Sequence, residues 1–108
     1  HVRRPWRAMA SLAQLLAPGG TLLVAVPAVV GEPVHDKEDY FRFTATSVHT
    51  MGEDAGLELL EMQHLGNALT SIGAMLELSA EDFTEAELLT PDSYRYGGVY
   101  AEFQKPVD

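Results

Sequence analysis

The side chains best suited to chemistry lie in one short stretch of the chain. His35, Asp36 and Asp39 place an imidazole close to two carboxylates. Negative neighbours raise the pKa of a histidine, so an imidazole in this setting can act as a general base near neutral pH. Tyr40 and Arg42 follow, and a guanidinium can hold a carboxylate or phosphate through paired hydrogen bonds. The stretch predicts a substrate-binding loop with His35 as the candidate catalytic base and substrate contacts from His35, Asp39, Tyr40 and Arg42.

The same residues also have a purely structural interpretation. A run of charged side chains is often no more than a solvated loop. Phe41 and Phe43 would then point into the core, while Arg42 would pair with Asp36 or Asp39 and hold the loop in place. The sequence leaves the binding and the structural interpretation open.

A metal site is a further alternative for this loop. His35 and a neighbouring carboxylate could supply two ligands, with His49 or His64 as the third. The histidines do not follow the H-x-x-x-H or H-E-x-x-H spacing, and the chain has no cysteine. Disulfides and sites that require cysteine ligands are therefore excluded, and we expect no metal.

Charge and length limit the partners. The 108 residues include 7 basic and 16 acidic side chains, which gives a formal net charge of −9. This length fits one domain, and this charge argues against nucleic acid or an anionic membrane as a partner. The longest apolar run, 22–30, contains Pro27 and falls short of the about 20 residues that a membrane span needs. We expect a soluble, cytoplasmic protein.

The first elements along the chain are a helix, a tight turn and a strand. Pro5 suits the first turn of a helix, and Trp6 and Met9 begin an apolar stripe at helical spacing. Trp6 is therefore expected to pack in the core, and the alternative is that it lines the mouth of a cleft. Pro18-Gly19-Gly20 ends this helix. Thr21–Val26 is a continuous apolar run, which predicts a strand buried on both faces inside a parallel sheet.

The later elements alternate in the same way. Thr44 is a candidate N-cap for a helix that ends near Ala55, and strands are expected over 57–65 and 99–104. Apolar spacing predicts a helix over 69–79, and a shorter one is expected over 85–89. The predicted class is α/β, with a mixed sheet of about three strands and flanking helices.

Several segments within roughly the first sixty residues form a recognisable pattern, namely His1-Val2, Pro5–Met9, Leu15–Pro27, His35, Asp39-Tyr40, Arg42–Thr44 and Asp54–Leu57. Together they resemble a known family, the class I S-adenosylmethionine-dependent methyltransferases of type 11. The resemblance implies a partial Rossmann-like methyltransferase fold in which Leu15–Pro27 spans the turn before the fifth strand and the strand itself. It also implies methyl transfer from S-adenosylmethionine to an acceptor that the sequence does not identify.

The resemblance assigns roles to particular positions. His1 matches a histidine at the rim of the cofactor and substrate cleft, which makes it a cofactor-binding candidate. The loop 28–43 would shape the acceptor site, and 99–104 matches the family's antiparallel last strand. The family's glycine-rich cofactor turn has no counterpart, because the chain has no G-x-G-x-x-G. We therefore expect residues 1–108 to be a single, incomplete domain, the C-terminal half of such an enzyme, with weak or no cofactor binding alone.

Two other functions fit the same residues. The chain could be a catalytically silent interaction module, whose homodimer covers an exposed edge of the sheet or buries the 69–78 helix across a two-fold axis. A small hydrolase that uses His35 and Asp39 is the other option, although the chain has no G-x-S-x-G motif.

Overall fold

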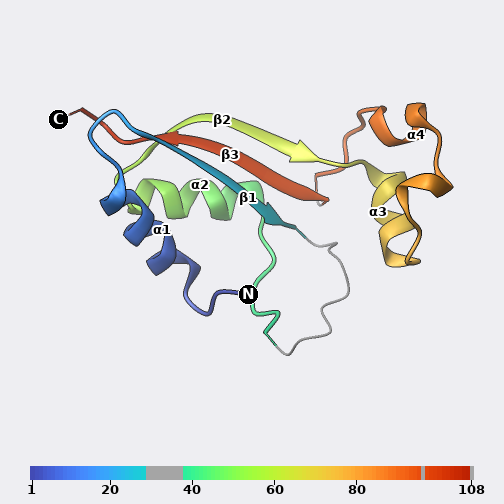
Figure 1. Ribbon diagram of the computed structural model, residues 1–108, viewed down its shortest axis with the longest axis horizontal. Coiled ribbons are helices and arrows are strands. Elements are labelled where there is room, and N and C mark those ends of the chain that lie inside the picture. The colour runs from blue at the N-terminus through green and yellow to red at the C-terminus, as the bar shows by residue number, and fades with distance from the viewer. Residues whose placement is uncertain (29–37, 96, 108) are drawn as a thin grey trace.

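The fold is a three-stranded sheet with helices on one face and a small helical lobe at one end (Figure 1). We describe it from a computed structural model, which covers residues 1–28, 38–95 and 97–107. The predicted helices and strands are present in the predicted order, although the helix expected over 69–79 ends at Met75. The α/β class and the three-stranded sheet are confirmed. The elements are α1 (Pro5–Leu15), β1 (Thr21–Pro27), α2 (Ala45–Asp54), β2 (Glu58–Leu65), α3 (Ala68–Met75), a 3-10 turn (Ala80–Asp82), α4 (Glu85–Leu89) and β3 (Gly98–Gln104).

The last strand, β3, lies in the middle of the sheet. It pairs antiparallel with β1 on one side and with β2 on the other, so Ala101 faces Val24 and Met62. As a result β1 and β2 run in the same direction without pairing, and α2 lies between them in the chain. The expected parallel pairing is therefore wrong for the described strands, and a Rossmann-like arrangement is not confirmed by them.

The position of β1 also corrects the expectation for Thr21–Val26. β1 is an edge strand of the described sheet, and its residues alternate between exposed and half-buried. Leu22 and Val24 pack against the core, whereas Leu23 is 60% exposed. The apolar run predicts a strand correctly, but α1 and α2 cover only one face of the sheet (Figure 1). The prediction of burial on both faces therefore fails.

A distant lysine completes the C-terminal end of α1. Lys105 follows β3, and its ammonium donates to the carbonyl oxygens of Ala13 at 2.9 Å and Leu16 at 2.8 Å. Carbonyls at the end of a helix lack partners within the helix and carry partial negative charge, so a cation is stabilising there. The turn that follows uses Gly19 at φ 79°, a conformation that glycine adopts without strain.

The helix α2 begins and ends with local signals that the sequence predicted. The Thr44 hydroxyl accepts from the Ser47 backbone N–H, and the Ser47 hydroxyl oxygen accepts from the Thr44 N–H. This reciprocal cap satisfies two donors at the start of the helix. Gly56 has a φ of 80° just beyond the last turn, a backbone conformation that ends a helix close to the predicted end at Ala55.

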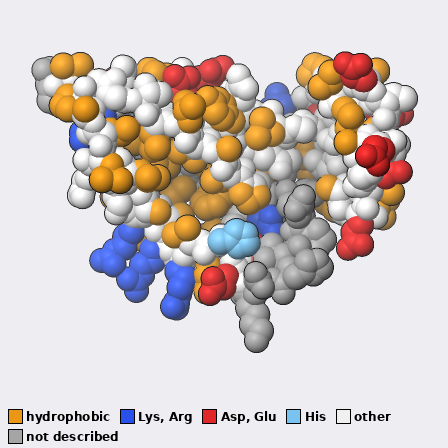
Figure 2. All heavy atoms as spheres, in the orientation of Figure 1, with side chains coloured by type: hydrophobic (Ala, Val, Ile, Leu, Met, Phe, Trp, Pro, Cys, Tyr) orange, Lys and Arg blue, Asp and Glu red, His pale blue; other side chains and the backbone are white. Residues whose placement is uncertain are grey.

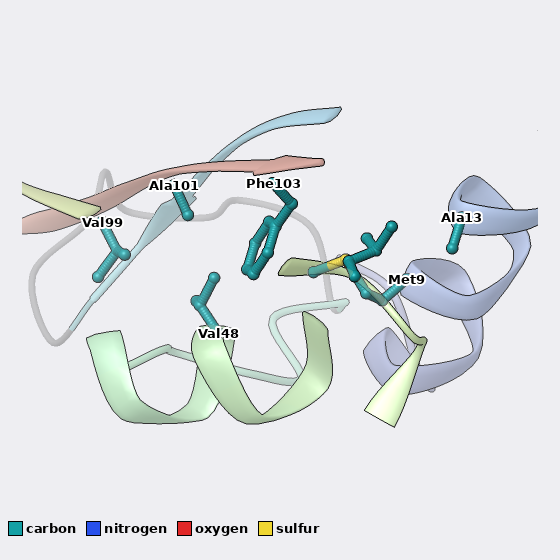
Figure 3. Close-up of a cluster of buried hydrophobic side chains, with 7 residues drawn as sticks. Met9, Ala13, Val48, Val99, Ala101 and Phe103 are labelled. Carbon is teal, nitrogen blue, oxygen red and sulfur yellow. The ribbon is translucent and has the colours of Figure 1, made fainter. Parts of the chain in front are cut away.

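The core lies between the sheet and α2, with α1 at its side (Figure 3). Phe103, Val48 and Val99 are its largest fully buried side chains. A Cβ atom on Gly52 would come within 2.2 Å of the Phe103 ring. The absence of a side chain at Gly52 therefore lets α2 approach β3 closely.

The helical lobe, residues 67–95, is organised by one buried amide. Asn67 is 4% exposed, and its side-chain oxygen accepts from the Thr70 N–H as the cap of α3. Its side-chain nitrogen donates to the carbonyl oxygens of Glu87 at 2.8 Å and Thr90 at 3.0 Å. One side chain thereby links the start of α3 to α4 and the residue that follows it.

The helices of the described chain are short. The longest, α1, has 11 residues, whereas a bilayer requires about 20. Among the residues that the structure describes, no helix is long and apolar enough to span a membrane.

Candidate functional site

A largely apolar hollow of about 430 Å³ opens between α1, the C-terminal end of β1 and the segment that leads into α2. Open α/β sheets bind ligands beyond the carboxyl ends of their strands, and β1 ends at this hollow with Val26 and Pro27. The lining residues are His1, Val2, Pro5, Ala8, Met9, Leu12, Val24, Val26, Pro27, Asp39, Phe41, Arg42, Phe43 and Met51.

Two contacts join the start of the chain to the segment that follows residue 37. The Nδ1 atom of His1 lies 3.0 Å from the backbone carbonyl oxygen of Glu38. The Arg3 guanidinium lies over the Tyr40 ring, 5.8 Å from its centroid, within the range of a cation–π contact. His1 is thus at the edge of the hollow, and its role in cofactor binding stays a prediction, while Tyr40 faces Arg3 and is not among the lining residues.

Aromatic rings extend this rim. Trp6 meets Phe41 edge-on with ring centroids 5.9 Å apart, and Phe41 stacks on Phe43 at 6.4 Å. Trp6 is 51% exposed, so the expectation that it packs in the core is wrong. Helical spacing identifies the face of a helix that carries apolar groups, but it does not say whether a distant segment covers them. Neither this ring pair nor the lining by Met51 is signalled by a motif in the sequence.

Arg42 and Asp39 form an ion pair at the hollow. The Nη2 atom of Arg42 donates to Oδ2 of Asp39 at 2.6 Å, and their side chains are 29% and 41% exposed. The pairing of Arg42 with Asp39, one part of the structural interpretation, is confirmed, whereas Phe41, which that interpretation placed in the core, is 37% exposed. A guanidinium carries five N–H donors. Among the described residues, the hydrogen bond to Asp39 is the only one found for the Arg42 side chain. Arg42 can therefore still bind an acidic ligand.

The histidines do not form a centre in the part of the chain that the structure describes. His35 and Asp36 lie outside the described residues, so the prediction of a catalytic base at His35 remains a prediction. His49 pairs with Glu53 along α2 at 2.7 Å. His64 lies on β2 with its Nδ1 atom buried and without a described hydrogen-bond partner. No group of three or more His, Asp or Glu side chains within residues 1–28, 38–95 and 97–107 could hold a metal ion.

Figure 2 shows basic side chains gathered at the lower left and acidic side chains on the helical lobe at the right, with further acidic side chains at the top of the sheet. Arg3, Arg4 and Arg7 surround the start of α1, whereas the helical lobe carries acidic residues. A shallow second hollow is lined by these three arginines together with Val2, Ala8 and Ser11.

Comparisons of the chain with protein-family models, with curated proteins and with solved structures find no match. What the site can do follows from its own geometry. It has an apolar floor, an aromatic rim and one ion pair, which suits binding and orientation of a small molecule.

Proposed function

We propose that the chain is the C-terminal part of a class I S-adenosylmethionine-dependent methyltransferase domain and is inactive by itself. The resemblance that suggests this is densest around the Pro18-Gly19-Gly20 turn and the strand after it. That turn leads from α1 directly into β1. The described elements thus have the order that the resemblance implies.

The observation that carries the proposal is the unpaired edge of β1. In the described sheet β1 pairs with β3 alone, and the one further backbone partner found for it among the described residues is the Phe43 N–H, which donates to the Pro27 carbonyl oxygen at 2.9 Å. A free edge next to exposed apolar side chains such as Leu23 favours association with another strand. The resemblance makes β1 the fifth strand of its domain, and the preceding strands would cover this edge.

The course of β3 gives independent support. The resemblance matches 99–104 to the family's antiparallel last strand, and β3 is antiparallel to both of its neighbours. The roughly sixty matching residues do not include this strand. The direction of β3 therefore supports the proposal independently of the resemblance in the first sixty residues.

The residues present do not make a cofactor site by themselves. Such sites place a glycine-rich turn between a strand and the helix after it. Here Gly19-Gly20 comes before β1 and follows a helix, and Gly97-Gly98 leads into β3. His1 could contribute to the rim of a site that other residues complete.

The described residues supply the acceptor side of the reaction in this proposal. Arg42 and Asp39 lie at the hollow, with Tyr40 on the neighbouring rim, and the proposed base, His35, lies outside the described residues. A methyl transfer gains most of its acceleration when the acceptor atom is held in line for attack. The hollow would hold the acceptor's body while the polar residues orient its reactive group.

Calorimetric titration tests the proposal. We expect S-adenosylmethionine to give no low-micromolar binding to the 108-residue chain, and to bind a natural gene product in which upstream sequence precedes this segment. ATP, which shares the adenosine, is the control ligand. Low-micromolar cofactor binding by these 108 residues alone contradicts the proposal, as does an upstream sequence without a strand and a glycine-rich turn.

The second candidate function is a dimerising module. It is favoured by the apolar side chains of α3, where Leu69, Ile72 and Met75 are 45%, 55% and 62% exposed. Light scattering after size-exclusion chromatography separates the candidates. A stable compact dimer that Ile72→Glu converts to a monomer favours the module, whereas a monomer at all concentrations excludes it.

A further inference from the structure

We infer that the hollow beside α1 binds a small amphipathic anion, with its apolar body in the hollow and its acidic group on the arginines at the start of α1. The binding itself follows from the described residues. The identification of this molecule with the methyl acceptor rests on the proposed function. No motif in the sequence points to this ligand, because its two halves come from different segments.

The hollow has the size and the lining of a site for an apolar ligand group. Its volume of about 430 Å³ is within the range of small-molecule sites, roughly 300–1,000 Å³. Its floor and walls include Met9, Leu12, Val24 and Met51. Phe41 and Phe43 add flat aromatic surface. A ligand gains affinity here by burying hydrocarbon or a ring.

The arginines at the start of α1 can bind the acidic group of the ligand. Arg4 and Arg7 are exposed, and neither forms an ion pair within the described part of the chain. They line the second hollow together with Val2 and Ala8, and those two residues also line the apolar hollow. The two hollows therefore meet at Val2 and Ala8 on the start of α1, and the inference requires the acidic group of the ligand to reach past these residues to the arginines.

The charge distribution favours an anion at the start of α1, where three basic side chains are close together in the sequence. The formal net charge is −9, yet Arg3, Arg4 and Arg7 are three of the seven basic residues. Acidic side chains dominate the helical lobe at the other end (Figure 2). The N-terminus of α1, which has 11 residues, adds a positive dipole end to the same place.

A small molecule fits these features better than a large polyanion. A nucleic acid or an anionic membrane would interact with a wide face of the protein, whose net charge repels it. A single acidic group on an apolar body needs only the local cluster. The hollow is also bounded, because the Trp6–Phe41 pair and the Arg42–Asp39 pair stand at its edge.

Two fluorescent probes test the inference on the 108-residue chain. N-phenyl-1-naphthylamine and 8-anilino-1-naphthalenesulfonate share their rings and differ by the sulfonate. We expect both to bind and to quench Trp6, the only tryptophan, with the sulfonate probe about tenfold tighter at low salt. High salt should reduce this preference, because the arginines are exposed. Decanoate and decanol form a second such pair.

Matched variants separate the two halves of the site. Arg4→Gln with Arg7→Gln should remove the preference for the sulfonate probe and leave the neutral probe unchanged, whereas Arg95→Gln on the helical lobe should change neither. Ala8→Phe fills the hollow and should weaken both probes at least about tenfold. Ala10→Phe, on α1 but outside the lining, is its control, and circular dichroism verifies that each variant is folded.

Three results would overturn the inference. The first is equal affinity for the two probes. The second is probe binding that Ile72→Glu abolishes and Ala8→Phe does not. The third is binding of anionic vesicles without binding of monomeric decanoate. None of them affects the titrations with S-adenosylmethionine, so the ligand inference and the methyltransferase proposal fail independently.

Discussion

The indole of Trp6 meets the ring of Phe41 edge-on, with centroids 5.9 Å apart and an interplanar angle of 88°. Trp6 belongs to the first turn of α1, and Phe41 lies in the segment that enters α2. The pair therefore ties two segments that are far apart in the sequence. It also makes the single tryptophan a reporter of the rim of the hollow.

Replacement of Phe41 by leucine tests this contact. An edge-to-face pair contributes about 0.5–1.5 kcal/mol beyond its buried area, so we expect Phe41→Leu to lower the free energy of unfolding by about 1 kcal/mol. Trp6 emission should shift to the red, because its ring gains water contact. Phe83→Leu in the helical lobe is the control and should leave the emission unchanged. An unaltered Trp6 spectrum in Phe41→Leu would show that the rings do not touch in solution.

The Arg42–Asp39 pair should contribute little to stability. Both side chains are partly exposed, and exposed pairs contribute about 0.2–1 kcal/mol. A double-mutant cycle with Arg42→Met and Asp39→Asn, measured by urea unfolding, should give a coupling energy below about 1 kcal/mol that decreases with salt. A coupling well above that value, insensitive to salt, would mean that the pair is buried away from water.

Two glycines offer a matched test of packing. A Cβ atom on Gly52 would lie 2.2 Å from the ring of Phe103, and one on Gly73 would lie 2.2 Å from the ring of Phe83. Phe103 is fully buried and cannot move, whereas Phe83 is partly exposed and can turn outward. Overpacking costs about 1–3 kcal/mol, so Gly52→Ala should be clearly destabilising in chemical unfolding.

Gly73→Ala should cost much less, because alanine favours a helix over glycine by roughly 1 kcal/mol and its neighbour can yield. The contrast depends on the different burial of the two rings. Equal losses of stability for the two variants would contradict the packing described for Phe103.

The buried amide of Asn67 should determine the local stability of the helical lobe without affecting the stability of the sheet. Asn67→Asp keeps an oxygen that can accept from the Thr70 N–H and removes the donations to Glu87 and Thr90. Unpaired buried groups cost about 1–3 kcal/mol, so amide exchange should accelerate over 85–90. Ser79→Ala, which alters an exposed cap of the same lobe, is the control. Equal acceleration of exchange in β3 would show that the lobe and the sheet unfold together.

Local signals in the sequence determined where most elements begin and end. Thr44 caps α2 through atoms three residues away, and Gly56 stops it with a left-handed backbone. The strand 99–104 was predicted from its alternation, since side chains along a strand point to opposite faces. Such signals act within one or two turns of the chain, so the sequence alone carries them.

Tertiary contacts decided which neighbours those elements have. The apolar run of β1 predicted a strand, but its antiparallel pairing with β3 depends on a segment near the other end of the chain. The exposure of Trp6 and the hollow between α1 and β1 depend on which distant segments lie against α1. Lys105 caps α1 across 92 positions of sequence. The sequence could not specify these relationships locally, because each one depends on which distant segments the folded backbone brings together.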